Sequence, residues 1–231
     1  SSFFIFNQNG VNMSKKTKKD VTYNDLVKEF QEEAVSLTNY VLSNRQFCDL
    51  ELLLNGAFDP LKNFMSQSDY NSVLDSMRLK NGELWPIPIT LDSNKDYLNS
   101  NNLEKGSKIS LRDKEGFLIA IMTIDDIWKV DKKREANCIY GTNDINHPGV
   151  KYLFEQVKEY YIGGKVQEIQ LPHHYDYQLL RHTPLELKKQ FKKLGWKKII
   201  AFQTRNPMHR AHKEISYRAA IDNGANLLIH P

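Results

Sequence analysis

Residues 202–212 read Phe-Gln-Thr-Arg-Asn-Pro-Met-His-Arg-Ala-His, and this stretch decides the fold of the chain. It follows a short apolar run with a basic entrance at 197–202, which predicts a buried strand. It leads into a predicted helix over 208–223, which Gly224 ends, and a second strand is predicted over 225–229. This order of strand, loop, helix and strand indicates the opening βαβ unit of an α/β fold.

The junction between this strand and this helix is a predicted anion site. Asn206 is expected to cap the helix and Pro207 to occupy its first position. The free backbone N–H groups of the first turn and the helix dipole then point at the loop. His209 and His212 are expected on one face of that turn, and Arg205 adds a planar set of donors that suits an oxyanion.

Residues 203–212 resemble the signature Gln-x-Arg-Asn-Pro-x-His-x-x-His of the sulfate adenylyltransferase family, also called ATP sulfurylase, at every fixed position. Segments 56–65, 85–91 and 147–150 also resemble segments of that family. Asn63 stands where the family pattern has glycine, and asparagine tolerates the left-handed backbone region, so the turn is expected to survive.

The resemblance implies an α+β part followed by an α/β part. A PUA-like β-barrel domain is expected over 20–175, after a disordered tail at 1–19. The linker and the first β-α-β of a Rossmann-like nucleotide-binding domain are expected over 176–231, where that domain is truncated. Because the remainder of the adenine pocket would lie outside this stretch, residues 1–231 alone are expected to show little or no catalysis.

Periodicity and turn residues predict further elements. Helices are expected over 23–42, 68–77, 148–161 and 185–194. Strands are expected over 84–91, 108–111, 117–124, 127–130 and 166–171, and Gly163-Gly164 is expected to end the third helix. Residues 84–130 together indicate a small barrel or sheet.

The reaction that the resemblance implies joins ATP and sulfate into adenosine 5′-phosphosulfate and pyrophosphate, in sulfate activation. Sulfate is a doubly charged, weak nucleophile that approaches a charged α-phosphate, so positioning and charge neutralisation are the main catalytic tasks. The implied catalytic residues are Thr204, Arg205, Asn206, His209 and His212. The implied sulfate ligands are Arg205 and Gln203, and the implied ligands of the ATP phosphates are Gln203, Thr204, Asn206, His209 and His212.

Several of these residues have a structural alternative. Asn206 could serve as a cap without a ligand, and Thr204 as a turn residue. For His230 a satisfied place at a strand end is favoured over the nucleotide site, and His173 and His174 are interpreted as parts of a connector. Two histidines are too few ligands for zinc, so no protein-bound metal is expected, and Mg²⁺ is expected with ATP.

Composition limits the remaining classes. A net charge of +4, from 32 basic and 28 acidic residues, is too small to indicate a nucleic-acid partner. Cys48 and Cys138 are expected to be buried, reduced thiols. No run approaches the roughly 18 apolar residues of a membrane span, so no membrane partner is expected. A cytoplasmic location follows, with an organelle as the alternative, and Met13 is the expected start of translation.

A binding module is the second interpretation of the chain: a PUA-like domain that contacts RNA or a protein and carries an inactive catalytic stub. Basic and aromatic side chains clustered on the barrel would favour it. Trp85, Trp128 and Phe117 instead fall at the spacing of a strand core, which favours the enzyme. The resemblance is also compatible with a homo-oligomer of the full-length form.

Overall fold

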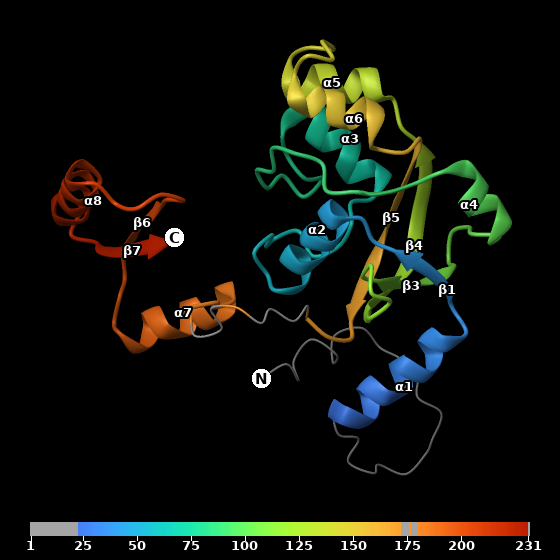
Figure 1. Cartoon of the computed structure of the whole chain (residues 1–231), viewed down its shortest axis with the longest axis horizontal. Helices are drawn as coiled ribbons and strands as arrows, with labels where there is room; N and C mark the ends of the chain where they lie inside the picture. Colours follow the sequence, from blue (N-terminus) through green and yellow to red (C-terminus); the bar gives the residue numbers. More distant parts are fainter. Residues whose placement is uncertain (1–22, 172–175, 177–179, 231) are drawn as a thin grey trace.

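A computed structural model describes residues 23–171, 176 and 180–230 (Figure 1). The side chains of residues 23–27 lie outside this description, as do the predicted tail at 1–19, His173 and His174. We call residues 23–171 the first unit and residues 180–230 the second unit.

The first unit contains a five-stranded sheet and six helices among its described residues. The strands are β1 (Thr38–Val41), β2 (Leu91–Ser93), β3 (Lys108–Arg112), β4 (Leu118–Lys129) and β5 (Tyr160–Glu168). The helices are α1 (Tyr23–Val35), α2 (Asn44–Leu54), α3 (Gln67–Ser76), α4 (Lys95–Ser100), α5 (Lys132–Tyr140) and α6 (Pro148–Glu155). The sheet order is β1-β3-β4-β5-β2, in which β1 and β3 are parallel and the other pairs are antiparallel.

The core of the first unit has two main parts. One packs α2 and the segment 61–65 against the sheet, with Leu50, Phe64, Leu111 and Met122 fully buried. The other lies between α3, α5 and α6, which Figure 1 shows together at one end of the sheet. Apolar side chains from every strand, Tyr40 in the case of β1, reach these clusters, so the sheet and its helices form one packed body.

The helix predicted over 23–42 is wrong in its second half. Helix α1 ends at Val35, and residues 38–41 form β1, which pairs in parallel with β3. Thr38, Tyr40 and Val41 are β-branched or aromatic and favour a strand, and Tyr40 is buried in the core. Pairing with β3 therefore determines the structure of residues 38–41, although the spacing of their apolar side chains also fits a helix.

The helix predicted over 148–161 is too long, because α6 ends at Glu155. Gly163 and Gly164 do not end a helix; they lie inside β5. A Cβ atom on Gly163 would lie 2.2 Å from the carbonyl oxygen of Met65, and one on Gly164 would lie 2.2 Å from that of Thr123. The two glycines are needed because other backbone segments approach β5 this closely.

Other predictions for the first unit need smaller changes. The strands predicted over 117–124 and 127–130 form one strand, β4, with an irregularity between Ile124 and Asp126. The strand predicted over 84–91 is wrong for most of its length: residues 85–90 form no strand, and the observed edge strand β2 begins at Leu91. Cys48 and Cys138 are free thiols as predicted, but both are exposed and not buried.

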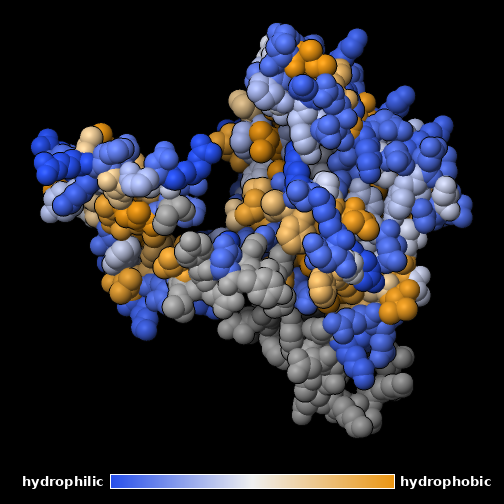
Figure 2. Space-filling model, in the orientation of Figure 1, coloured by the Kyte–Doolittle hydropathy of each residue, from blue (hydrophilic) through white to orange (hydrophobic). Residues whose placement is uncertain are grey.

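The second unit consists of α7 (Pro184–Lys193), β6 (Ile199–Gln203), α8 (Arg210–Asp222) and β7 (Asn226–His230). Strands β6 and β7 are parallel and α8 connects them, which confirms the predicted βαβ unit. Ser216 and Ala220 of α8 are buried, whereas Ile215 and Ile221 are exposed. Figure 2 shows apolar residues at the surface of this part of the chain.

Candidate active site at the start of α8

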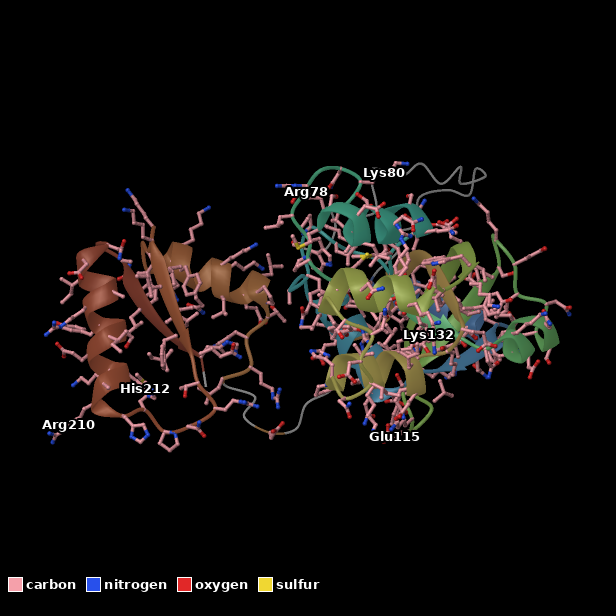
Figure 3. The ribbon with its side chains drawn as sticks, turned by 90° about the horizontal axis from the view of Figure 1, so that it is seen from above. Arg78, Lys80, Glu115, Lys132, Arg210 and His212 are labelled. Carbon is pink, nitrogen blue, oxygen red and sulfur yellow. The ribbon has the colours of Figure 1, made fainter. Side chains whose placement is uncertain are left out.

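The junction between β6 and α8 carries the residues that the sequence singled out. Strand β6 ends at Gln203, the loop continues through His209, and α8 begins at Arg210. Figure 3 shows His212 beside this loop at the N-terminal end of α8, with Arg210 projecting outward from the helix. The site is therefore built at the carboxyl end of a parallel strand, where the first turn of the next helix faces it.

The predicted helix start at Asn206 is wrong by three residues, because His209 occupies the N-cap position with an extended backbone (φ −82°, ψ 164°). A tight turn delays the helix. The hydroxyl of Thr204 accepts a hydrogen bond from the N–H of Asn206 at 3.1 Å and donates one to its carbonyl oxygen at 2.9 Å. Asn206 is thus part of a turn, and its side chain does not cap the helix.

Thr204 also joins the loop to the second strand. Its backbone N–H donates to the carbonyl oxygen of His230 at 3.0 Å, at the end where Gln203 and His230 are register partners. His230 therefore lies next to the loop, at a strand end. A turn role was one of the two interpretations of Thr204, and its hydroxyl and N–H bonds do form the turn.

The two histidines contact each other. Their ring centroids are 5.4 Å apart, and the backbone N–H of His209 donates to Nδ1 of His212 at 3.4 Å. The ring of His212 also lies 5.5 Å from the ring of Phe202, which precedes Gln203 on β6. His212 is half-buried in this arrangement, whereas His209 is exposed. The sequence predicted the pairing of the histidines but did not identify Phe202.

The loop and the first turn of α8 are electropositive. Arg205, Arg210 and Lys213 are exposed, and residues 202–213 contain no carboxylate. The nearest acidic residue along the chain, Glu214, forms an ion pair with Arg218 at 2.5 Å. Within the described residues, the backbone N–H groups of Arg210 and Ala211 have no acceptor. The site therefore offers side-chain and backbone donors to an anion.

Three other possibilities, a metal site, an aromatic binding surface and a membrane span, have less support in the residues that the structure describes. They contain no group of three or more His, Cys, Asp or Glu side chains that could hold a metal ion. Trp128 is buried on β4, as predicted for a strand core. Trp85 is half-buried against the core but lies outside any strand, and Phe117 is exposed at the β3–β4 turn, contrary to the prediction. No helix among these residues is long and apolar enough to cross a membrane.

Comparison with family models gives two matches along the chain. Residues 12–171 match the model of the PUA-like domain, and residues 178–231 match the model of ATP-sulfurylase. The first match covers the sheet of the first unit, and the second covers the β6–α8 junction.

Curated relatives and a solved structure are also similar to this chain. The chain is 48% identical to the sulfate adenylyltransferase of Mycosarcoma maydis, over 92% of this chain and 38% of that protein. It is 53% identical to that of Phaeosphaeria nodorum, over 88% of this chain and 36% of that protein. A structure titled "Hexameric APS kinase from Thiobacillus denitrificans" is similar with a TM-score of 0.69 and 36% identity, over 88% of this chain and 36% of that chain. The chain thus spans little more than a third of the length of these relatives.

Proposed function

Because the chain belongs to the sulfate adenylyltransferase family, we propose that it carries part of the substrate site of an enzyme that joins ATP and sulfate. The products are adenosine 5′-phosphosulfate and pyrophosphate, and the enzyme serves sulfate activation. The observation that carries this proposal is the β6–α8 junction. It gathers Gln203, Arg205 and both histidines around a helix start that has free N–H groups and no neighbouring carboxylate.

On the sulfate side, we assign Arg205 and Gln203. Arg205 is exposed on the loop, and its planar guanidinium can donate two parallel hydrogen bonds to one sulfate. Gln203 is exposed at the end of β6 and adds a neutral donor. A sulfate dianion must approach a negatively charged α-phosphate in this reaction, so a fixed positive charge beside sulfate lowers the cost of that approach. Sulfate needs no deprotonation, so the site needs no general base.

On the nucleotide side, we assign His209 and His212 to the α- and β-phosphate oxygens of ATP, where negative charge grows as pyrophosphate leaves. The hydroxyl and N–H of Thr204 fix the turn, which supports a positioning role for that residue. Asn206 is exposed and does not cap α8, so its amide is available to the same phosphates. Mg²⁺ enters as the MgATP substrate.

The proposal also covers assembly and location. The similar Thiobacillus protein is hexameric by its title, and we infer a homo-oligomer for this enzyme. The free thiols of Cys48 and Cys138 support the cytoplasm, where thiols stay reduced. Binding of RNA by the first unit has no specific observation in its favour.

A chimera tests the activity, because the chain spans only part of its relatives. Residues 1–231 replace the matching portion of the Mycosarcoma maydis protein, and formation of adenosine 5′-phosphosulfate is measured with pyrophosphate release. Arg205→Ala is expected to lower kcat/KM for sulfate about 10²- to 10³-fold, and Arg205→Lys to recover only part of the loss. Lys193→Ala, an exposed charge on α7, is the control and leaves the rate unchanged. Equal rates for Arg205→Ala and Lys193→Ala would contradict the assignment.

A further inference from the structure

Phe202 lies beneath the first turn of α8. Along β6 the half-buried residues are Ile200 and Phe202, which share one face of the strand. Along α8 the sheet-facing stripe runs through His212, Ser216 and Ala220, four residues apart. The two stripes meet at their ends, where the rings of Phe202 and His212 lie 5.5 Å apart at an angle of 39°.

Three contacts, made by two residues, hold the imidazole of His212. The Phe202 ring lies on one side, the His209 ring lies 5.4 Å away, and the His209 backbone N–H donates to Nδ1 at 3.4 Å. Because Nδ1 accepts this hydrogen bond, the proton of the neutral imidazole is on Nε2. Nε2–H has no acceptor within the described chain, and so it is the donor that a ligand can use.

The two histidines therefore differ. His209 is exposed, and its ring contact within the described residues is with His212 itself. Its side chain has no aromatic ring of β6 beneath it. His212 is half-buried and fixed by contacts from both the strand and the loop. A donor held in place before the ligand arrives loses less orientational entropy in the reaction.

We propose that Phe202 is a positioning residue, which holds the imidazole of His212 in the tautomer and orientation that present Nε2–H to a phosphate oxygen of ATP. This inference rests on the proposed function. Phe202 is apolar and lies outside the signature at 203–212, and its role here is to fix the orientation of one histidine donor, His212. If Phe202 had a purely structural role, any loss of packing on that face of β6, such as Ile200→Ala, would change the His212 tautomer and kcat as much as Phe202→Leu does.

The first test needs no activity and uses the chain as it is. Long-range ¹H–¹⁵N spectra of the histidine side chains, recorded at mildly alkaline pH, are expected to show His212 as the Nε2–H tautomer. In Phe202→Leu, which keeps an apolar side chain but loses the ring, the His212 signals are expected to shift toward an average of both tautomers. Phe202→Tyr, which keeps the ring, is expected to retain the original signals. Ile200→Ala, which removes packing from the same face of β6, is the matched control and is expected to retain them as well.

The second test uses the chimera. Phe202→Leu is expected to lower kcat roughly 10- to 100-fold, because a donor that is displaced by about 1 Å costs that much, while KM for sulfate stays within about twofold. Phe202→Tyr is expected to restore kcat, and Ile200→Ala to leave it near that of the parent.

The outcomes separate the two proposals. An Nδ1–H tautomer in the parent chain, or equal effects of Phe202→Leu and Ile200→Ala in either test, overturns the positioning role. So does an altered tautomer in Phe202→Leu with unchanged kcat. A folded chimera that forms no adenosine 5′-phosphosulfate, although His212 has the expected tautomer, overturns the proposed function and the catalytic part of this inference with it.

Discussion

Replacing Tyr161 with phenylalanine removes one of the two hydroxyls that donate to the buried carboxylate of Glu135. Both hydroxyls, from Tyr70 on α3 and Tyr161 on β5, lie 2.9 Å from Oε2 of Glu135 on α5. The phenylalanine ring keeps the edge contacts of Tyr161 with Tyr70 and Trp128, at 5.6 and 5.8 Å. The substitution therefore isolates one hydrogen bond that joins two elements of a three-element cluster.

The size of the effect follows from the charge of the acceptor. A hydrogen bond to a charged group contributes about 1.5–3 kcal/mol, and a neutral one about 0.5–1.5 kcal/mol. We expect Tyr161→Phe to lower the free energy of unfolding by about 2 kcal/mol in the parent chain at mildly alkaline pH. In a Glu135→Gln background the same change should cost about 1 kcal/mol, so the coupling between the two positions is about 1 kcal/mol.

Urea denaturation followed by tryptophan fluorescence measures both values. Trp196→Phe in all variants leaves Trp85 and Trp128 as reporters of the first unit. Tyr160→Phe is the matched control. Tyr160 precedes Tyr161 on β5, and its hydroxyl makes no hydrogen bond within the described residues. Removing this hydroxyl should change the free energy of unfolding by less than about 0.5 kcal/mol. Equal losses for Tyr161→Phe in the parent chain and in the Glu135→Gln background would refute the reasoning.

Three further predictions concern the same fold and site. Burial raises the pKa of Glu135 above its ordinary value of 4.5. The contribution of this group to the free energy of unfolding is therefore fully present below pH 4.5 and is lost as pH rises through the folded-state pKa. In urea titrations at several pH values, the parent should lose stability relative to Glu135→Gln across that window. Gly164→Ala places a Cβ 2.2 Å from a carbonyl oxygen of β4 and should cost about 1–3 kcal/mol or more in the same assay, and an unchanged midpoint would contradict the close approach. Thr204→Val removes the hydroxyl bonds that hold Asn206 in its turn and should lower kcat of the chimera about tenfold, whereas Thr204→Ser should retain most of it, since serine keeps the hydroxyl.

Local signals predicted much of the fold. The apolar runs at 108–111 and 117–124 placed β3 and the first part of β4, and the run at 197–202 together with Gly224 placed the βαβ unit. Helix α2 was not predicted, although its signal is present: Ser43 and Gln46 form a capping box in which each side chain bonds to the other's backbone. A serine followed three residues later by glutamine, just before an apolar run, is typical of a helix start.

Other features depend on partners that lie far along the chain. Residues 38–41 become a strand because β3 lies beside them, and Gly163-Gly164 sit inside a strand because the segment at Met65 crosses it. A sequence pattern carries neither fact. In the candidate site, the signature indicated the histidines, but the contact with Phe202 depends on the angle at which α8 crosses β6.

The order β1-β3-β4-β5-β2 has a consequence for synthesis on the ribosome. Strand β2 has one neighbour, β5, so Leu91 has no strand partner until the ribosome has released Ile162, its register partner on β5. Strand β4 likewise keeps one side open until β5 covers it. Contacts of such long sequence separation slow folding, and an open edge invites pairing with another nascent chain. The strand that carries the Gly163-Gly164 pair is therefore the last to join, and it supplies the missing partner of both β2 and β4.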